Sequence, residues 1–372
     1  MSARVLISIN AFKGSIPARA ATDIVAAAFE AEGFEVEKVY LADGGDGTVD
    51  VAAALGAQIE FVKTTDPVMR PIQAPVAWLG RTAVIEMAKA SGLAQIAVEE
   101  RNPMVTTTWG TGILLRHALE QGAERVILGI GGSATVDAGL GMLAAVGFSV
   151  TDPSGAASWR GGEALAVVDH IAAGRYVRGA EIIVASDVIS PLCGPAGAAA
   201  VFGPQKGATP EMVTLLAKGL ERFADITLAS TGVRLHDMPG AGAAGGAGGA
   251  AVAWLGGRLQ PGAELFMDLE NFDRRAATCA LLVTGEGRID AQTLAGKAPI
   301  RVARRFQAVS PGGLTIAITG EVRDRSLVRE AGIDAMVTIE DRPMSEREAM
   351  ENAEGLLRQA AAETAHMLSF HV

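Results

Sequence analysis

The sequence contains only two cysteines, Cys193 and Cys279, among its 372 residues. So few thiols exclude a disulfide framework and a thiolate metal cluster, and they suit a reducing compartment. The N-terminal residues lead directly into an apolar strand pattern, without the long apolar segment and cleavage site of an export signal. We therefore expect a cytoplasmic protein in which both cysteines are small apolar side chains of the core.

Positive charge is also scarce, because 32 Lys and Arg face 42 Asp and Glu, for a formal net charge of -10. No run rich in Lys or Arg interrupts this balance, so we expect no nucleic acid as a partner. The uncharged stretch 238–257 consists largely of glycine and alanine and is too weakly hydrophobic to span a bilayer. We therefore expect no membrane partner either.

Aromatic residues make up only 5% of the sequence, although 49% of its residues are hydrophobic. Ala, Val, Leu and Ile must therefore supply most of the core. The chain is longer than one hydrophobic core normally supports, which predicts two domains.

Short apolar runs alternate with helical patterns at both ends of the chain. Residues 5–9 form one such run, and 280–284, 314–319 and 335–339 form others in the last third. This alternation is typical of a parallel sheet with helices on both faces. Prolines punctuate strand-like pieces over residues 59–86, which suggests antiparallel strands of another domain. We predict an α/β fold with a doubly wound parallel-sheet domain, residues 1–65 plus 285–372, and an inserted mixed α/β domain, residues 66–284.

A buried strand and a glycine-rich turn lie within residues 125–142. Residues 126–130 form a short apolar run bounded by glycine, as in a strand buried on both faces of a parallel sheet. Glycines let the backbone turn there and leave N–H groups open, and hydroxyls and a carboxylate follow where we expect the next helix to begin. The residues of this predicted anion site are Gly129, Gly131, Gly132, Ser133, Thr135 and Asp137.

The same turn fits a relaxed dinucleotide-binding fingerprint, Gly129-x-Gly131-x-x-Ala134, with Asp152 about twenty residues further on. A plain tight turn accounts for the spacing equally well. The fingerprint nevertheless supports a second hypothesis, an NAD-dependent oxidoreductase of small hydroxy acids. Such an enzyme needs a catalytic His or Tyr near the cofactor, and the chain has only two tyrosines and no well-placed histidine, so this hypothesis is disfavoured. A third hypothesis is a non-catalytic ligand-binding module.

Four other loops combine glycine with acidic or basic residues, and several of them follow predicted strands. Each loop alone is a common kind of turn. Phosphoryl transfer needs backbone N–H donors and cations that hold phosphates, and carboxylates that hold Mg²⁺ or orient the acceptor. No Walker A motif and no protein-kinase motif set is present, which excludes those two ATP-binding architectures. The cationic candidates are Lys13, Lys206, Arg288 and Lys297, and the carboxylate candidates are Asp43, Asp46, Asp187, Glu286 and Asp290.

The loop motifs occur along the chain as FKGS at 12–15, ADGGDGT at 42–48, GIGGSAT at 129–135, SDV at 186–188, PLCGPAGAAAVFGPQKGA at 191–208, GAGAAGG at 240–246, TGEGRIDAQT at 284–293 and GKAPI at 296–300. This combination resembles the bacterial glycerate kinases that phosphorylate D-glycerate after glycolate, glucarate or galactarate breakdown. The motifs follow the order of that family and cover nearly the whole chain.

The resemblance implies a Rossmann- or flavodoxin-like domain, a second mixed α/β domain and an active cleft between them. It also implies ATP, Mg²⁺ and D-glycerate as ligands, with 2-phosphoglycerate as the usual product, although the sequence does not exclude 3-phosphoglycerate. The expected nucleotide-binding residues are Gly129, Gly131, Gly132, Ser133, Thr135, Lys206, Gly285, Glu286 and Gly287.

The resemblance also implies a set of catalytic residues. Lys13 and Arg288 would neutralise phosphate or the glycerate carboxylate. Asp187 and Asp290 would hold Mg²⁺ or orient the attacking hydroxyl, and Asp43 would help to close the site.

This chain departs from the family pattern at three places. Asn10 and Ala11 stand where the family commonly has an Asp-Ser pair, which puts a catalytic acid at that spot in doubt. Val136 and Ala138 replace a usual Asn and Gly, and Ser190 replaces a usual Asn. The sequence leaves open whether the protein is a monomer or a homodimer.

Overall fold

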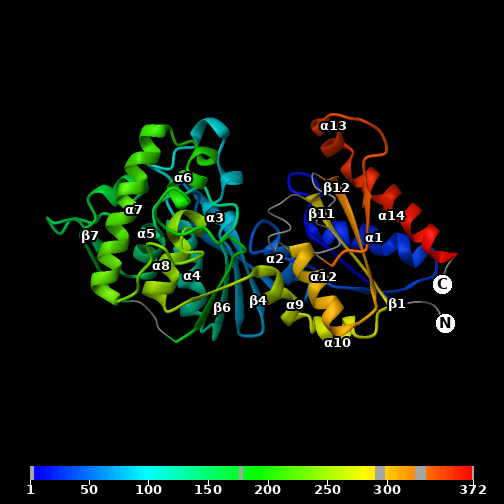
Figure 1. The fold of residues 1–372 in the computed structure, drawn as a ribbon. Helices are drawn as coiled ribbons and strands as arrows, with labels where there is room; N and C mark the ends of the chain where they lie inside the picture. Colours follow the sequence, from blue (N-terminus) through cyan, green and yellow to red (C-terminus); the bar gives the residue numbers. More distant parts are fainter. Residues whose placement is uncertain (1–3, 176–178, 290–297, 323–331, 371–372) are drawn as a thin grey trace. The chain divides into compact units, whose positions relative to one another are not determined.

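The structure is a computed structural model that describes residues 4–175, 179–289, 298–322 and 332–370 of the chain (Figure 1). No helix in these ranges combines the length and the apolar character that crossing a membrane requires.

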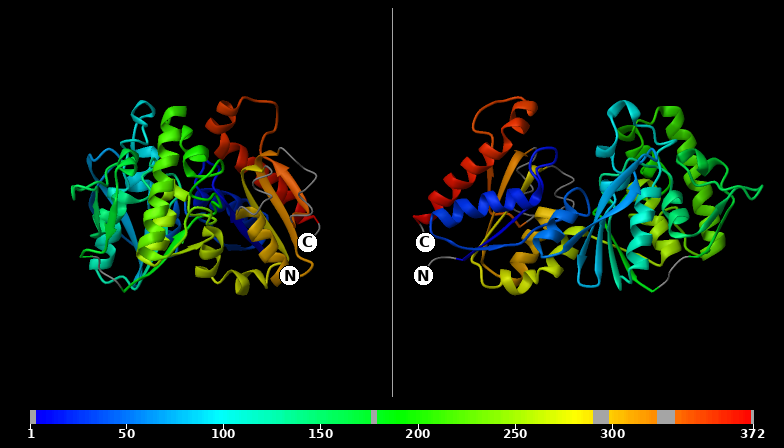
Figure 2. Two further views of the ribbon diagram at one scale, coloured as in Figure 1. Left: turned by 60° about the vertical axis from the view of Figure 1, so that its left-hand side comes forward. Right: turned by 180° about the vertical axis from the view of Figure 1, so that it is seen from behind.

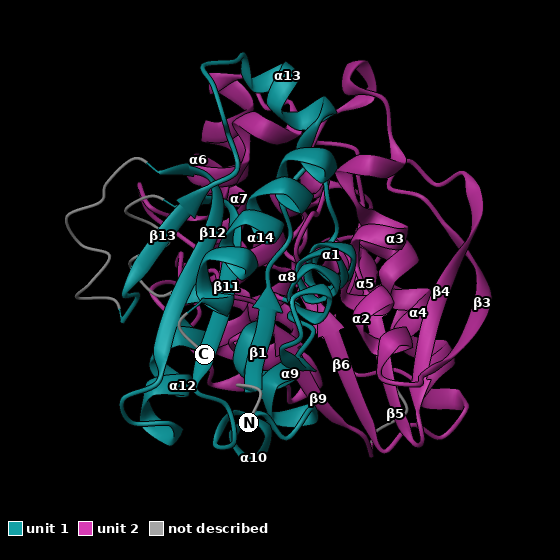
Figure 3. Ribbon diagram, turned by 90° about the vertical axis from the view of Figure 1, so that its right-hand side faces the viewer, with its two compact units in different colours: residues 1–42, 263–372 teal, residues 43–262 magenta. Residues whose placement is uncertain are grey.

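The chain forms two compact units (Figure 3). Unit 1 joins residues 1–42 to residues 263–372, and unit 2 comprises residues 43–262. The α/β fold class, with a parallel-sheet domain and an inserted mixed domain, is confirmed. The units divide at residues 42 and 263, whereas the sequence predicts boundaries at 65 and 285. The observed boundaries differ from the predicted ones for two reasons. The strand ending at Thr65 pairs within the sheet of unit 2, and the strand beginning at Leu281 pairs within the sheet of unit 1.

Unit 1 contains a five-stranded sheet in the order β13-β12-β11-β1-β2, and all of its neighbouring strands are parallel. Its strands are β1 (Arg4–Ile9), β2 (Glu35–Lys38), β11 (Leu281–Ile289), β12 (Leu314–Val322) and β13 (Ala335–Thr338). Its helices are α1 (Ala18–Ala31), α9 (Gly262–Leu269, which begins on the last residue of unit 2), α10 (Phe272–Ala276), α12 (Ala298–Val309), α13 (Glu346–Glu351) and α14 (Ala353–Ser369).

Helices cover both faces of this sheet, as a doubly wound fold requires. Val5, Ile7 and Ile9 of β1 pack in one core with α1 and α14, whereas Leu6 packs in a second core with α9, α10 and α12. Successive side chains of a strand point to opposite faces, so a strand covered on both sides is apolar throughout. Helices α1 and α14 come from opposite ends of the chain and lie side by side (Figure 2).

Unit 2 contains a six-stranded mixed sheet in the order β10-β9-β6-β5-β4-β3. Its strands from β10 to β5 are parallel, whereas β3, β4 and β5 are antiparallel neighbours, which confirms the antiparallel strands expected over residues 59–86. The strands of this sheet are β3 (Gln58–Thr65), β4 (Pro71–Leu79), β5 (Thr82–Glu86), β6 (Arg125–Gly129), β9 (Glu181–Ala185) and β10 (Arg258–Gln260). A separate hairpin pairs β7 (Ser149–Thr151) with β8 (His170–Ala172).

The helices of unit 2 pack chiefly around one large core. Val126 and Leu128 of β6 belong to this core together with residues of α4, α5, α7 and α8, and Ile127 between them is also fully buried. The helices are α2 (Thr48–Ala54), α3 (Ala88–Ser91), α4 (Trp109–Glu120), α5 (Leu140–Val146), α6 (Ala198–Phe202), α7 (Pro210–Thr231) and α8 (Ala247–Leu255). Of the two cysteines, Cys279 is buried as expected, whereas Cys193 is only partly buried.

Candidate active site

Unit 2 gathers the carboxyl ends of three neighbouring parallel strands at one edge of its sheet. The register places Glu86 of β5 beside Gly129 of β6, and Gly129 beside Ala185 of β9. The loop of residues 129–135 leaves β6 at this edge, and Asp187 follows the end of β9. Open α/β sheets bind ligands at this end of their strands.

A second glycine-rich loop, residues 43–48, lies against the loop that leaves β6. The N–H of Gly131 donates to the carbonyl oxygen of Gly44, with an N–O distance of 2.8 Å. A Cβ added to Gly131 would lie 2.4 Å from the Cα of Gly45, and one added to Gly44 would lie 2.0 Å from the carbonyl oxygen of Ala185. Only glycine permits so close an approach. The structure therefore brings these two predicted loops together.

Two carboxylates fix the 43–48 loop. Oδ1 of Asp43 accepts from the N–H of Gly45 at 2.9 Å. The buried carboxylate of Glu86 accepts from the N–H of Gly47 at 3.2 Å and of Val49 at 3.0 Å. Burial raises the pKa of Glu86, although these N–H donors oppose the shift. The only sign in the sequence that Glu86 holds this loop is its place as an acidic residue at the end of an apolar strand.

Asp137 is a second buried carboxylate, and it holds the end of the loop that leaves β6. Its Oδ2 accepts from the N–H and from the hydroxyl of Thr108, each at 2.8 Å. The N–H of Gly139 donates to Oδ1 at 3.1 Å, and the N–H of Gly141 donates to Oδ2 at 3.4 Å. Asp137 is fully buried, and burial raises the pKa of its carboxyl. Its contacts make it part of the frame behind the loop.

The segment after β6 differs from a dinucleotide-binding turn. We expected the next helix to begin within residues 133–137, whereas α5 begins at Leu140. Ala138 and Gly139 have φ angles of 50° and 73°, and this left-handed backbone is incompatible with a helix before Leu140. Asp152 lies in a turn after β7 and accepts from nearby main-chain N–H groups. The elements required by the dinucleotide fingerprint are therefore not in place.

Lys206 reaches the same loop from the segment after α6. It ends a short 3-10 turn, Pro204–Lys206, and only 2% of its surface is exposed. Its Nζ donates to the Oγ of Ser133 at 2.8 Å and to the carbonyl oxygen of Thr135 at 2.7 Å. Burial lowers the pKa of Lys206 from 10.5 to about 7, against the opposing charge of Asp137. Lys206 thus contacts two other predicted nucleotide-site residues.

In unit 1, two neighbouring parallel strands bring further predicted segments together. The N–H of Asn10, just after β1, donates to the carbonyl oxygen of Gly285 in β11 at 2.8 Å. A Cβ added to Gly287 would lie 3.2 Å from the Cα of Phe12. The carboxyl edge of this sheet therefore carries the predicted residues Lys13, Gly285, Glu286, Gly287 and Arg288.

The Arg288 side chain is paired with two carboxylates of unit 1. Its Nε donates to Glu321 at 2.6 Å, and its Nη2 donates to Glu346 at 3.1 Å. The side chain of Arg288 is 42% exposed, so water screens both pairs. Any anionic ligand that binds Arg288 must compete with these carboxylates.

The predicted magnesium ligands are Asp187 and Asp290, and Asp290 lies outside the described residues. Within the described ranges, no three His, Cys, Asp or Glu side chains gather closely enough to hold a metal ion. Mg²⁺ is commonly bound by one or two carboxylates together with phosphate oxygens and water. Asp187 follows the end of β9, whose last residue, Ala185, contacts Gly44 of the 43–48 loop, so its carboxylate is the described candidate for that mode of binding.

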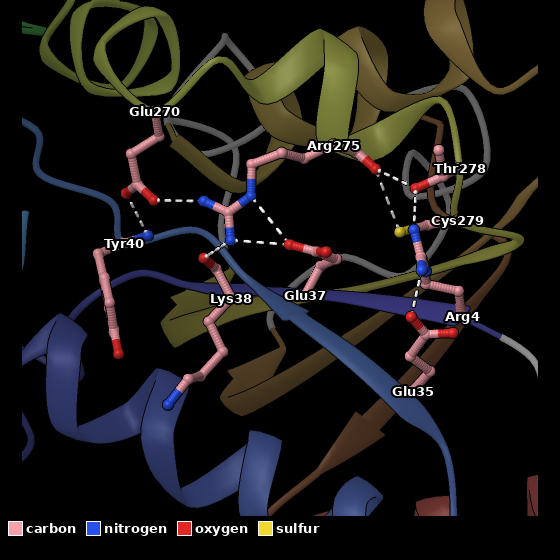
Figure 4. Close-up of polar contacts among 9 residues, drawn as sticks. All are labelled: Arg4, Glu35, Glu37, Lys38, Tyr40, Glu270, Arg275, Thr278 and Cys279. Carbon is pink, nitrogen blue, oxygen red and sulfur yellow. Dashed lines mark hydrogen bonds and ion pairs between the residues drawn. The ribbon is translucent and has the colours of Figure 1, made fainter.

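An ion pair in unit 1 fixes the segment that leads into the 43–48 loop (Figure 4). Glu270 accepts from the N–H of Tyr40 at 2.6 Å and from Nη1 of Arg275 at 2.9 Å. Arg275 also donates to the carbonyl oxygen of Lys38 at 2.6 Å and to Glu37 at 3.0 Å. Burial raises the pKa of Glu270 to about 7 despite these donors.

Comparison with known proteins identifies the family. The sequence model of the glycerate kinase family matches residues 5–369. The chain belongs to the glycerate kinase family. It is 41% identical to a glycerate kinase of Bacillus subtilis (strain 168), with 97% of each chain covered, and 38% identical to a glycerate 2-kinase of Escherichia coli (strain K12), with 90% of each covered. A solved structure from Salmonella typhimurium LT2, assigned as glycerate kinase 2, superposes with a TM-score of 0.85 at 37% identity, covering 100% of this chain and 99% of that one.

Membership of the glycerate kinase family confirms the resemblance seen in the sequence. Because these relatives are named as kinases, the prediction of an enzyme is confirmed, and neither the oxidoreductase nor the binding module is favoured. In this family member, the predicted site residues within the described ranges fall into two groups, one at the carboxyl edge of each sheet.

Proposed function

We propose that this enzyme transfers the γ-phosphoryl group of ATP to the C2 hydroxyl of D-glycerate, giving 2-phosphoglycerate. The observation that carries the proposal is the match to the glycerate kinase family over residues 5–369. The relative from Escherichia coli is named as a 2-kinase, which favours C2 as the acceptor. Phosphorylation at C3 is the alternative outcome.

The nucleotide is assigned to the glycine-rich segments at the strand ends. In unit 2, the main-chain N–H groups of Gly132 and Ser133 and the hydroxyls of Ser133 and Thr135 would hold phosphate oxygens, with Lys206 behind them. In unit 1, residues 285–287 would contribute further contacts. Main-chain N–H groups bind phosphate without bringing a charge that must itself be desolvated.

The catalytic residues are assigned by their charge. Lys13 and Arg288 would neutralise phosphate or the glycerate carboxylate, and Asp43 would help to close the site. Asp187, with Asp290, would hold Mg²⁺ or orient the acceptor. Mg²⁺, when bound, neutralises charge on the phosphate oxygens.

The chemical step moves one phosphoryl group and one proton. The acceptor oxygen forms a bond to the γ-phosphorus while the bond from that phosphorus to the leaving oxygen of ADP breaks. The acceptor proton passes to a carboxylate, for which Asp187 and Asp290 are the candidates. Asn10 cannot serve, because an amide does not accept a proton at neutral pH. This residue is buried, and its N–H bonds to Gly285.

An ADP-release assay with D-glycerate and Mg²⁺, followed by NMR of the product, tests this function. We expect ADP to form only when D-glycerate is present, and the phosphorus of the product to couple to the C2 proton. A lack of ADP formation would reject the kinase assignment, and coupling to the C3 protons would replace 2-phosphoglycerate by 3-phosphoglycerate. Titration with NADH, followed by nicotinamide fluorescence, should show no binding.

A further inference from the structure

Lys206 is among the largest fully buried side chains of the described protein. The backbone turns sharply just after it, because Gly207 has a φ of 91° and a Cβ there would lie 2.1 Å from the carbonyl oxygen of Arg101. The turn packs against the segment that contains Arg101, and the lysine side chain extends to Ser133 and Thr135. Its ammonium group therefore lies behind the loop that leaves β6.

The two hydrogen bonds of Lys206 have a fixed direction. An ammonium group can donate but cannot accept, whereas a serine hydroxyl can do both. The Oγ of Ser133 must therefore accept the bond from Nζ, at 2.8 Å, and its own proton remains available to another acceptor. The carbonyl oxygen of Thr135 takes a second bond from Nζ, at 2.7 Å, which holds the lysine in place.

The direction of the hydrogen bond between Lys206 and Ser133 depends on the charge of the lysine. Within the described residues, no carboxylate forms an ion pair with Nζ. Asp137 is the acidic group that acts on Lys206 electrostatically, and its own oxygens are occupied by donors from Thr108, Gly139 and Gly141. Burial and this one carboxylate therefore determine the pKa of the Lys206 ammonium group.

We propose that Lys206 is a positioning residue that acts through Ser133, because its ammonium group commits the Ser133 hydroxyl proton to a phosphate oxygen of the bound nucleotide. This inference rests on the proposed function, since it assigns a phosphate to the loop of residues 129–133. It gives Lys206 a role without contact between the lysine and the nucleotide, in keeping with its burial.

Loss of a proton from the Lys206 ammonium group would allow the hydrogen bond with Ser133 to reverse its direction, although the lysine stays in place. A neutral amine can still donate to Thr135, but it can also accept from Ser133, whose proton would then point toward Lys206 instead of the ligand. Since burial lowers the pKa of Lys206 to about 7, this reversal falls within an ordinary assay range. Binding of the nucleotide should therefore weaken as the pH rises through about 7.

Direct binding of ATP, measured by isothermal titration calorimetry between pH 6 and 8.5, tests the proposal without requiring turnover. We compare the unaltered protein with Ser133→Ala, and use Ser154→Ala, the same substitution in a turn after β7, as the matched control. ATP itself titrates in this range, but it does so equally for every variant. The ratio of the Kd of a variant to the Kd of the unaltered protein at the same pH therefore reports only the contribution of the protein. We expect Ser133→Ala to raise the Kd about tenfold at pH 6 and far less at pH 8.5, and Ser154→Ala to change nothing.

Lys206→Met and the double variant Lys206→Met/Ser133→Ala complete the cycle. If the lysine acts through the serine, the double variant should bind ATP no more weakly than the weaker single variant. Additive losses, or a Kd ratio for Ser133→Ala that does not change with pH, would overturn the inference. Should Lys206→Met fail to fold, the pH dependence of Ser133→Ala decides alone. Absence of ATP binding by the unaltered protein would instead refute the proposed function.

Discussion

Lys206 of unit 2 and Glu270 of unit 1 are both buried ionisable groups, but their partners differ in kind. The ammonium of Lys206 bonds to a hydroxyl and a carbonyl oxygen. The carboxylate of Glu270 bonds to a main-chain N–H and to the guanidinium of Arg275. Asp137 of unit 2 likewise has only uncharged hydrogen-bond partners among these contacts, since it accepts from main-chain N–H groups and a hydroxyl.

The difference separates two ways of holding charge. Fixed dipoles around a buried ion keep it in one geometry and leave its charge uncompensated, so its field can act on a ligand. An opposite charge cancels that field and ties together the elements that carry the pair, as Arg275 does for the segment at Lys38 (Figure 4). We infer that the buried charges at the strand edge of unit 2 act electrostatically on a ligand. The pair of Glu270 and Arg275 instead holds two segments of unit 1 together.

The largest effect is expected from Asp187→Asn, which removes a charge at the strand edge of unit 2. As a candidate magnesium ligand or base, this carboxylate should contribute at least about 100-fold to kcat. Asp152→Asn removes the same charge from a turn after β7 and should leave kcat within about twofold. Steady-state ADP release measures both, and circular dichroism verifies that each variant is folded. Near-normal turnover of Asp187→Asn would show that this strand edge is not the catalytic one.

Asp137→Asn should cause the largest loss of stability, because it disturbs the dipoles that hold a buried ion. Donors approach both carboxylate oxygens of Asp137, and the asparagine NH₂ group would face some of them. We expect the free energy of unfolding to fall by about 2–4 kcal/mol. Urea denaturation measures this loss, with the exposed Asp237→Asn, expected to change it by less than about 0.5 kcal/mol, as the control. Equal losses for the two variants would contradict the role of Asp137.

The sequence predicts the sheets well because their signals are local. The apolar run 126–130 predicts β6, and the burial of this parallel strand on both faces explains why the run lacks alternation. The helix after β6 is the exception. We expected it to begin within residues 133–137, but the left-handed backbone at Ala138 delays it to Leu140. No local pattern reveals this, since alanine is not a typical residue for a left-handed backbone.

The candidate site is only partly predictable, because its glycines are local signals and its contacts are not. Glycine beside acidic residues identifies the 43–48 loop, and glycine after a buried apolar run identifies the loop that leaves β6. A lysine beside a glycine normally suggests a solvated turn, and Lys206 is buried only because distant segments pack around it. Likewise, the bond between Glu270 and Tyr40 joins residues 230 positions apart, which periodicity and propensity do not relate.

The two buried ions should give opposite pH dependences of stability. Glu270 has a pKa of about 7 in the folded protein and an ordinary value of 4.5, so the folded state retains a proton that the unfolded state loses between these values. Its contribution is complete below pH 4.5 and is lost as the pH rises through 7. Lys206 has a pKa of about 7 against an ordinary 10.5, so its contribution is lost as the pH falls from 10.5 through 7.

Denaturation of the unaltered protein, Glu270→Gln and Lys206→Met from pH 5 to 9 measures these slopes. Relative to Glu270→Gln, the unaltered protein should lose up to about 1.4 kcal/mol per pH unit between pH 5 and 7. Relative to Lys206→Met, it should gain stability by a similar slope above pH 7. If Arg275 keeps Glu270 ionised, the stability difference between the unaltered protein and Glu270→Gln should not change between pH 5 and 7. That result would mean that the charge of Arg275 outweighs the effect of burial on Glu270.

The smallest effect is expected from Glu346→Gln, which weakens an exposed ion pair of unit 1. The Glu346 side chain is 76% exposed, so the free energy of unfolding should change by less than about 0.5 kcal/mol. Because the variant frees Arg288 from one competing carboxylate, the KM for D-glycerate should fall about twofold if Arg288 binds the substrate carboxylate. Glu351→Gln removes a charge from the same helix, α13, at a residue paired with Arg347, and should leave KM unchanged. An equal fall of KM in both variants would indicate a general effect of charge. A fall of KM confined to Glu346→Gln would indicate that Arg288 binds the carboxylate of the substrate.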